Sequence, residues 1–545
     1  MNPFVGRMLR FLSASLLAWG LAVGLGPADV AAQRFLPDDP VWEDPDRLDM
    51  PVPEPRTASE RVSPVEVLSH TFGSPGVHSG PATNVNTLGE VPNSSWYTNR
   101  HYWHEQAPEA LARGPNAGPP PDTAAPWRVT SVTTRRGLPN AVIMDRQQRR
   151  YRLTFDSPAH PELATGAAMI ASRLFHALGY YVPEHHLLRI APDQLRAEPD
   201  SGVVRADVWT LFNTSHPYPD GTYRVLATRI PDAYRRIGPW RFHGTRHDDG
   251  NDVFPHELRR ELRGLRVFCA WMNHSKINES NTLGVVVRDG DRHYVRHYLR
   301  RFEATLGSAG AAPKAPWSGH EHVLDLGSVF TRIGTLGIAG GSWRNAKTPD
   351  LRGVGHIEAA FFRPPRWRAE LPNPAFERAD PADAFWAARQ VAAFSRADVE
   401  AVVATAQLSQ REAETYLVET LLARRDSIAH AYLDFAGGLD RFRVQGADLR
   451  FVDLRARHGL APDSVQRTVV WRAFDNQRNQ ATDRLARVRT AAETLSIPPA
   501  GAAFLQAAIR TPGRGTTTAY LRRDGVHGSG APRYEVVGLD RSAGP

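Results

Sequence analysis

Two arginines stand where a metal-binding acid is usual. Val295–Ser308 reads VRHYLRRFEATLGS, and its first five residues alternate in a way that predicts a strand, followed by a loop containing Gly307. Enzymes often place a metal-binding carboxylate where a strand ends in a loop. Here that position holds Arg300-Arg301-Phe302-Glu303. A guanidinium repels a divalent cation, so the pattern predicts that no metal ion binds at this exit.

The spacing of the other candidate metal ligands does not match that of a known metal site. The turn His247–Asp252 (HDDGND) has four side chains that could hold a hard cation. It lacks the spacing of a calcium-binding loop, which favours a solvated turn before the next helix. The histidine pairs favour packing roles, and no metal site is predicted from them; they are His101 with His104, His185 with His186, and His320 with His322.

The sequence lacks the motifs that several classes of enzyme require. None of the three lysines, Lys276, Lys314 and Lys347, follows a glycine, which excludes a Walker-type phosphate loop. The chain has no G-x-S-x-G and no H-E-x-x-H sequence. Its single cysteine, Cys269, lies in an apolar helical pattern and is predicted to be a core residue. The net charge of +8 comes from arginines interleaved with acids, so no nucleic-acid-binding face is predicted.

The N-terminus predicts export. Arg7 and Arg10 precede a short apolar run, and Val30 and Ala32 fit a signal-peptidase site before Gln33. Residues 1–32 are therefore predicted to be a signal peptide, with an uncleaved anchor as the alternative. The processed chain is expected in the periplasm or outside the cell, with no membrane span.

The remaining 513 positions, 33–545, fall into segments that differ in amino-acid composition and hydrophobic pattern. Residues 33–126 are predicted to form an extended arm, which docks aromatic side chains onto a later domain, and then a Pro-rich linker. Residues 127–232 predict three strands, a helix over 161–178 and two more strands. Residues 233–437 are predicted to form a helical region that contains a hairpin across Asp289–Arg292. Two capping-box patterns in it, Ser395 with Asp398 and Ser409 with Glu412, predict the starts of two helices. Residues 438–545 predict a small β-sandwich.

Several stretches carry a family resemblance: NSSWYTNR (93–100), YRLTFDSPAHPELATGAAMIASRLFHALGYYVPE (151–184), GTRHDDGNDVFPHELRRELRGLRVFCAWMNH (244–274), TLGS (305–308) and PNPAFERADPADAFWAARQVAAFS (372–395). They resemble exported bacterial proteins of an atypical kinase-like fold, distantly related to HipA, CotH and the secretory-pathway casein kinases. The resemblance covers Asn93 to Phe442. It implies an α+β, two-lobed atypical protein-kinase-like fold, with a β-rich N-lobe over 127–232 and a helical C-lobe over 233–437.

The residues that the resemblance makes catalytic are mostly replaced. The lysine of the third strand corresponds to Thr154, and the second glycine of the phosphate-covering turn corresponds to Asn140. The catalytic-loop aspartate falls at Ser275 or Lys276. The metal-binding Asp-Phe-Gly triplet falls at Arg301-Phe302-Glu303.

Only the metal-binding asparagine has a surviving candidate, Asn281, while the glutamate that pairs with the lysine falls near Ala168. Phosphoryl transfer needs the lysine and the metal-binding acids, so the chain is predicted to be a pseudokinase with no catalytic residue, metal or cofactor. Its degenerate cleft is predicted to consist of Thr154, Asn281, Arg301, Phe302 and Glu303.

The sequence leaves three functional hypotheses open. The preferred hypothesis is a binding or scaffold protein whose cleft, lined by Arg301 and Lys276, holds an anionic envelope ligand or contacts an active kinase-like paralogue. An alternative is an active phosphotransferase or nucleotidyltransferase that uses Glu279, Glu303 and either Asp248 or Asp249. A structural envelope protein is the third hypothesis.

Overall fold

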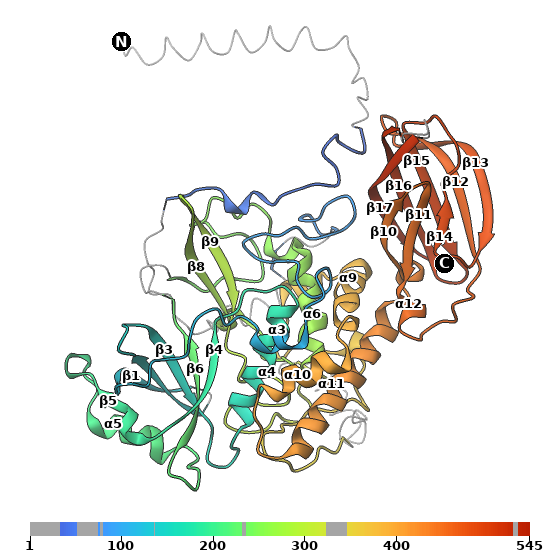
Figure 1. Cartoon of the computed structure of the whole chain (residues 1–545). Helices are drawn as coiled ribbons and strands as arrows, with labels where there is room; N and C mark the ends of the chain where they lie inside the picture. Colours follow the sequence, from blue (N-terminus) through green and yellow to red (C-terminus); the bar gives the residue numbers. More distant parts are fainter. Residues whose placement is uncertain are drawn as a thin grey trace, which may run out of the picture.

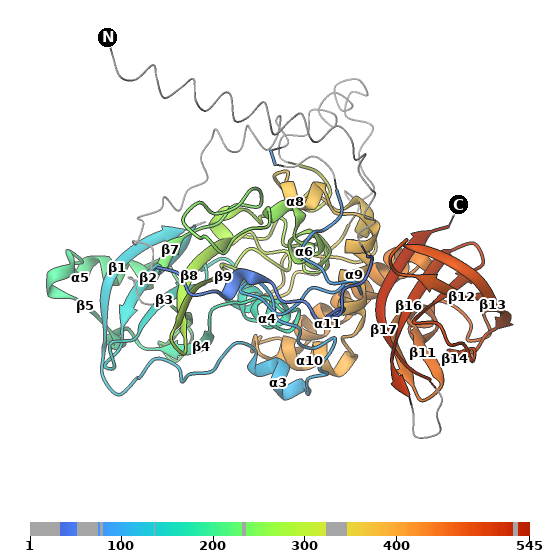
Figure 2. The ribbon, with the colours of Figure 1, turned by 90° about the horizontal axis from the view of Figure 1, so that it is seen from above.

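The chain forms an α+β structure, described by a computed structural model for residues 33–51, 75–76, 80–135, 137–231, 236–322, 346–526 and 532–544. The predicted signal peptide, residues 1–32, lies outside these ranges. A six-stranded sheet, a helical region and a C-terminal β domain follow one another across the molecule (Figures 1 and 2). None of the helices described is both long and apolar enough to span a membrane.

The six-stranded sheet has the order β4-β6-β3-β2-β1-β5. Its strands are β1 (Trp127–Arg135), β2 (Leu138–Met144), β3 (Arg150–Phe155), β4 (His185–Ile190), β5 (Leu195–Ala197) and β6 (Tyr223–Arg229). Side chains alternate between faces along β3, so Leu153 and Phe155 enter a core shared with α5 (Arg205–Asn213). Arg152 and Thr154 therefore lie on the opposite face of the sheet.

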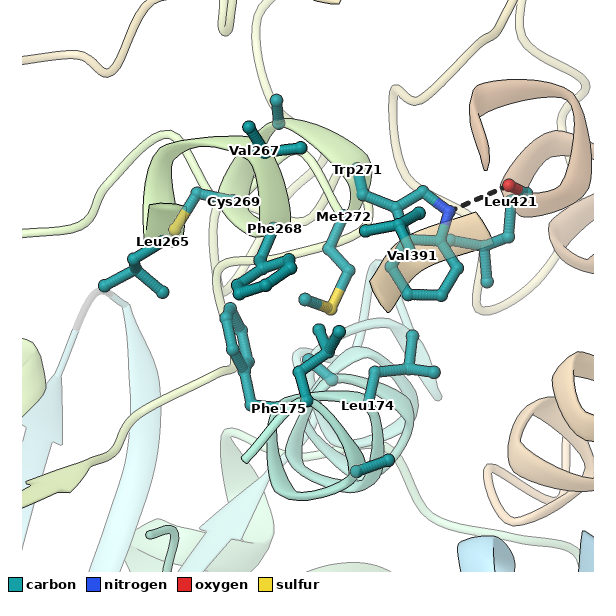
Figure 3. Close-up of a cluster of buried hydrophobic side chains, with 14 of the residues drawn as sticks. Leu174, Phe175, Leu265, Val267, Phe268, Cys269, Trp271, Met272, Val391 and Leu421 are labelled. Carbon is teal, nitrogen blue, oxygen red and sulfur yellow. Dashed lines mark hydrogen bonds between the residues drawn. The ribbon is translucent and has the colours of Figure 1, made fainter. Parts of the chain in front are cut away.

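One large hydrophobic core joins the helices. They are α3 (Pro108–Arg113), α4 (Leu163–Ala177), α6 (Arg260–Trp271), α8 (Pro374–Glu377), α9 (Pro381–Ala392), α10 (Arg396–Ala404) and α11 (Arg411–Tyr432). The predicted apolar face of α6 is buried, including Cys269, and the Trp271 indole donates to the Leu421 carbonyl at 2.8 Å (Figure 3). This confirms the prediction that Cys269 is a core residue.

The two predicted helix starts had different outcomes. Ser395 caps α10 in a capping box with Asp398, as predicted. The capping box predicted for Ser409 and Glu412 is wrong, because α11 begins one residue later, after Gln410. The Ser409 amide instead donates to the carboxylate of the buried Glu162 at 2.8 Å. A buried carboxylate needs donors, and Ser409 supplies two of them.

The predicted hairpin is confirmed. It consists of β8 (Thr282–Asp289) and β9 (Arg292–Leu299), which pair in register from Thr282 opposite Leu299 to Asp289 opposite Arg292. The short strand β7 (Arg236–Gly238) completes this three-stranded sheet. The hairpin leads directly into the segment Arg300–Glu303.

As predicted, the arm docks its aromatic side chains. Trp96 stacks on His297 of β9 with ring centroids 3.5 Å apart, and the Tyr102 hydroxyl donates to Asp440 at 2.5 Å. Phe35 lies among Phe474 and Tyr520 of the C-terminal domain. The arm therefore contacts the hairpin and the C-terminal domain, although these are far apart in the sequence.

The C-terminal domain has two sheets around one core. The smaller contains β10 (Leu439–Gln445), β11 (Asp448–Asp453) and β14 (Thr494–Ser496), and the larger has the order β13-β12-β15-β16-β17. The larger sheet comprises β12 (Arg467–Asp475), β13 (Gln480–Thr490), β15 (Phe504–Thr511), β16 (Gly515–Val526) and β17 (Pro532–Ala543). A single turn, α12 (Leu454–Arg457), follows β11. The two sheets share one hydrophobic cluster.

Candidate functional site

A small cavity brings together residues from three strands and the hairpin exit. Its volume is about 120 Å³, and its lining consists of Arg135, Leu138, Asn140, Arg152, Thr154, Ser280, Arg301 and Glu303. Three of the five residues predicted to form the cleft therefore line one cavity: Thr154, Arg301 and Glu303. We call this the arginine cavity.

Thr154 is held by its neighbour in the sheet. Thr154 and Asn140 face each other between β3 and β2, and the Thr154 hydroxyl donates to the Asn140 side-chain oxygen at 2.8 Å. The Asn140 amide donates in turn to the Leu138 carbonyl at 2.9 Å. Both side chains are buried, and each is engaged in the wall of the cavity. The position thus carries a neutral hydroxyl where the resemblance implies the amine of a lysine.

Asn281 does not line the cavity but holds the backbone of Arg301, which does. Its side-chain amide donates to the carbonyl of Arg301 at 3.1 Å, and its side-chain oxygen accepts from the Asn278 amide at 3.2 Å. Arg301 adopts a left-handed backbone with φ 65°, which is uncommon for a residue with a side chain of this size. Asn281 is fully buried and is not among the lining residues of the arginine cavity. Its contacts fix the backbone that carries Arg301.

Phe302 points into the hydrophobic core. Its ring stacks on Phe175 of α4, with centroids 5.2 Å apart and an interplanar angle of 22°. Its side chain is only 1% exposed. Phe302 therefore anchors the hairpin exit to α4, while the residues on either side of it, Arg301 and Glu303, face the cavity.

Positive charge dominates the arginine cavity. Burial, followed by repulsion from Arg300, Arg152 and Arg135, lowers the pKa of Arg301 to about 7. Burial and the neighbouring arginines lower the pKa of Arg300 to about 9. Burial also lowers the pKa of Arg152, and Glu303 opposes the shift in all three groups. A guanidinium rarely gives up its proton, so these groups remain charged and repel one another. A bound anion would offset this repulsion.

The loop expected to hold the catalytic aspartate has a buried lysine beside it. Ser275 donates from its hydroxyl to Glu370 at 2.9 Å and accepts from the Lys314 ammonium at 2.7 Å. Lys314 also donates to the Asn273 carbonyl at 2.6 Å. Lys276, which the sequence suggested as a second positive group of the cleft, is absent from the lining of the arginine cavity. The lysine that contacts Ser275 is Lys314.

The acids proposed as rearranged metal ligands have other partners. Asp248 pairs with Arg246 at 2.9 Å, Glu279 lies 3.9 Å from Arg241, and Asp249 accepts from the Asn251 amide at 3.0 Å. Glu303 faces the arginine cavity. Burial raises the pKa of Asp249 to about 6. Within the described ranges, no three acidic, histidine or cysteine side chains gather closely enough to hold a metal ion.

The predicted histidine pairs have packing contacts. His101 packs against Phe394, with its imidazole 3.6 Å from the Asp398 carboxylate. His185 Nδ1 lies 2.7 Å from the Pro183 carbonyl, and His322 Nδ1 lies 2.8 Å from that of Ala369. These contacts agree with the packing roles expected from the sequence.

Arg135 and Arg152 line the cavity but were not predicted from the sequence as site residues. A signal for Arg152 existed, because residues two apart in a strand share a face and Arg152 precedes Thr154 by two. Arg135 ends β1, and only the pairing of β1 with β2 brings it to the cavity.

Comparisons of the chain with protein-family models, with curated proteins and with solved structures found no match. The interpretation of the site therefore depends on the geometry and charges described above.

Proposed function

We propose that the chain is an exported, pseudokinase-like binding protein whose degenerate cleft, the arginine cavity, holds an anionic group without a metal ion. The proposal includes a two-lobed kinase-like arrangement of the six-stranded sheet and the helical region. The element order supports it: three strands, a helix, further strands, the helix α6, the hairpin and then further helices.

One observation carries the proposal. Thr154 in the third strand and Arg301 at the hairpin exit line the same small cavity, although they are far apart in the sequence. In a kinase-like cleft these two positions would carry the phosphate-binding lysine and the metal-binding aspartate. Their replacement by a hydroxyl and a guanidinium removes the metal site and leaves a surplus of positive charge.

The chemistry of the lining favours a compact anion. Arg135, Arg152 and Arg301 supply guanidinium groups, which bind phosphate, sulfate or carboxylate oxygens through paired hydrogen bonds. A cavity of about 120 Å³ accommodates such a group but not a whole nucleotide. The ligand is therefore an anionic group, either free or projecting from a larger molecule.

A thermal-shift experiment on the purified protein tests the proposal. Pyrophosphate, phosphate and sulfate are added with and without EDTA, and ATP is added with and without Mg²⁺ or Mn²⁺. An anion at 100 times its Kd stabilises the folded state by about 2.7 kcal/mol. We expect stabilisation by at least one anion, unchanged by EDTA, and no additional effect of the metal ions with ATP.

Two variants test whether the anion that causes the thermal shift binds in the arginine cavity. Arg301→Gln should remove the anion-induced shift, because it deletes a guanidinium from the cavity. Arg292→Gln changes an exposed arginine of β9 and should retain the shift. Stabilisation by ATP that requires a divalent cation would overturn the proposal and favour an active phosphotransferase. The absence of any anion effect in the wild-type protein would also overturn it.

A further inference from the structure

The outer face of the five-stranded sheet carries a cluster of arginines. The inner face packs into the domain core through alternate residues such as Val469, Trp471 and Ile509. The intervening residues face outward, and five of them form what we call the arginine face: Arg472 in β12, Arg484, Arg487 and Arg489 in β13, and Arg510 in β15. Figures 1 and 2 show β13 on the side of the domain that lies farthest from the helices.

The register fixes how these arginines are spaced. Arg489 and Arg510 flank Thr468 on its two neighbouring strands, which puts their backbones about 10 Å apart. Arg487 and Arg489 are two residues apart in one strand, a separation of about 7 Å. Arg472 is directly opposite Arg484. The guanidinium groups thus form an array across three adjacent strands.

Within the described residues, the arginine face lacks compensating acids. None of its five arginines forms an ion pair or a side-chain hydrogen bond there, whereas the nearby Arg478 pairs with Asp475 at 3.6 Å. The only acid in β13 is Asp483. Charged residues on an edge strand such as β13 also prevent sheet-to-sheet aggregation. That role does not account for Arg472 and Arg510, since β12 and β15 are interior strands.

We propose that the arginine face binds an acidic polysaccharide, a polymer whose carboxylate or phosphate groups recur along an extended chain. Charge complementarity over three strands suits a polymer better than a single small anion. The outward residues beside the arginines include Thr468, Gln506 and Thr516, whose hydroxyl and amide groups can pair with sugar hydroxyls. This surface is separate from the arginine cavity.

The same face is poorly suited to nucleic acids or membranes. Its aromatic residues, Phe474, Phe504 and Tyr520, pack against Phe35 of the arm and are not available to stack on bases. On β12 and β15 the apolar residues of this face are the small Val470 and Ala508. On β13, Leu485 is 37% exposed, and Val488, 46% exposed, pairs with the inward-facing Val469, so the face offers little surface for insertion into lipid.

Binding of the purified protein to fluorescently labelled oligogalacturonate tests the proposal, with neutral maltooligosaccharide as the uncharged control. We expect saturable binding of the acidic oligosaccharide only, weakened by added salt. The triple variant Arg487→Gln, Arg489→Gln, Arg510→Gln should bind about tenfold more weakly or worse, because three charge-assisted contacts are lost. The corresponding triple lysine variant should retain part of the affinity.

A matched triple variant controls for net charge. Arg196→Gln, Arg205→Gln and Arg292→Gln remove the same charge from exposed positions elsewhere and should leave binding unchanged. Equal thermal unfolding of the variants establishes that all are folded. Absence of binding by the wild-type protein overturns the proposal, as does equal loss in both glutamine triples. Tighter binding of duplex DNA or of vesicles containing anionic lipid overturns the assignment to a polysaccharide.

Discussion

The side-chain amide of Asn281 donates a hydrogen bond to the carbonyl of Arg301 at 3.1 Å. This contact joins the start of the hairpin to its exit and holds Arg301 in its left-handed conformation. The asparagine that the kinase resemblance makes a metal ligand thus has a structural partner. Its contacts determine where the Arg301 guanidinium lies in the cavity.

Asn281→Ala should destabilise the protein by about 1–3 kcal/mol, because it leaves the Arg301 carbonyl and the Asn278 amide without this partner in a buried site. It should also reduce the anion-induced thermal shift. Chemical denaturation and the thermal-shift assay measure the two effects. Asn213→Ala, at an exposed position in α5, is the control and should change neither quantity. Unchanged stability of Asn281→Ala would contradict the structural role.

Glu303→Gln should strengthen anion binding about three- to tenfold, because it removes a negative charge that competes with the ligand for the arginines. Titration of pyrophosphate in the thermal-shift assay gives the change in Kd. If Glu303 instead holds a metal ion for catalysis, the variant should lose metal-dependent ATP binding and gain nothing with pyrophosphate. Glu412→Gln, an exposed change on α11, is the matched control.

His185 should make stability depend on pH. Burial, followed by repulsion from Arg173, lowers the pKa of His185 to about 3 in the folded protein, compared with 6.5 when unperturbed. Below pH 6.5 the unfolded chain binds a proton at His185 that the folded chain does not, so stability falls as the pH falls from 6.5 towards 3. The expected loss from this group between pH 7.5 and pH 5 is roughly 2 kcal/mol.

Chemical denaturation at both pH values measures this loss. His185→Gln should be less stable than the wild-type protein at pH 7.5 but should lose less stability on acidification. His430→Gln, at an exposed position on α11, should retain the wild-type dependence. An equal pH dependence of His185→Gln and the wild-type protein would contradict the prediction.

Phe35→Ala should release the start of the arm from the C-terminal domain. Phe35 is 3% exposed and contacts the rings of Phe474, Phe504 and Tyr520, and its truncation costs about 3–5 kcal/mol of local packing energy. Limited proteolysis should cut the arm of the variant, between residues 36 and 51, much faster than that of the wild-type protein. The neighbouring Leu36 is 57% exposed, so Leu36→Ala is a close control that should keep the wild-type rate. Equal cleavage of Phe35→Ala and wild type would refute the docking role.

The sequence by itself determined the elements that carry strong local patterns. The apolar stripe of α6, the alternation in β3 and the turn across Asp289–Arg292 each fix a local structure through side-chain periodicity. The residue types at Thr154 and Arg301 could also be read from the sequence, where the kinase resemblance implies a lysine and an aspartate. By contrast, β13 has no apolar alternation that could predict it, since it lies at a sheet edge with both faces largely exposed.

Only the tertiary structure decided which residues share a site. Arg135 reaches the arginine cavity through the pairing of β1 with β2, and Lys314 reaches Ser275 across a loop. The capping residue of α11 also depended on a distant partner, because the buried Glu162 engages Ser409. Arg135 and Leu138 meet in a tight hairpin, but the contacts of Lys314 and Glu162 join segments far apart in the chain, and local periodicity carries no information about which segments meet. The arginine face likewise became apparent only when strand register aligned arginines from three strands.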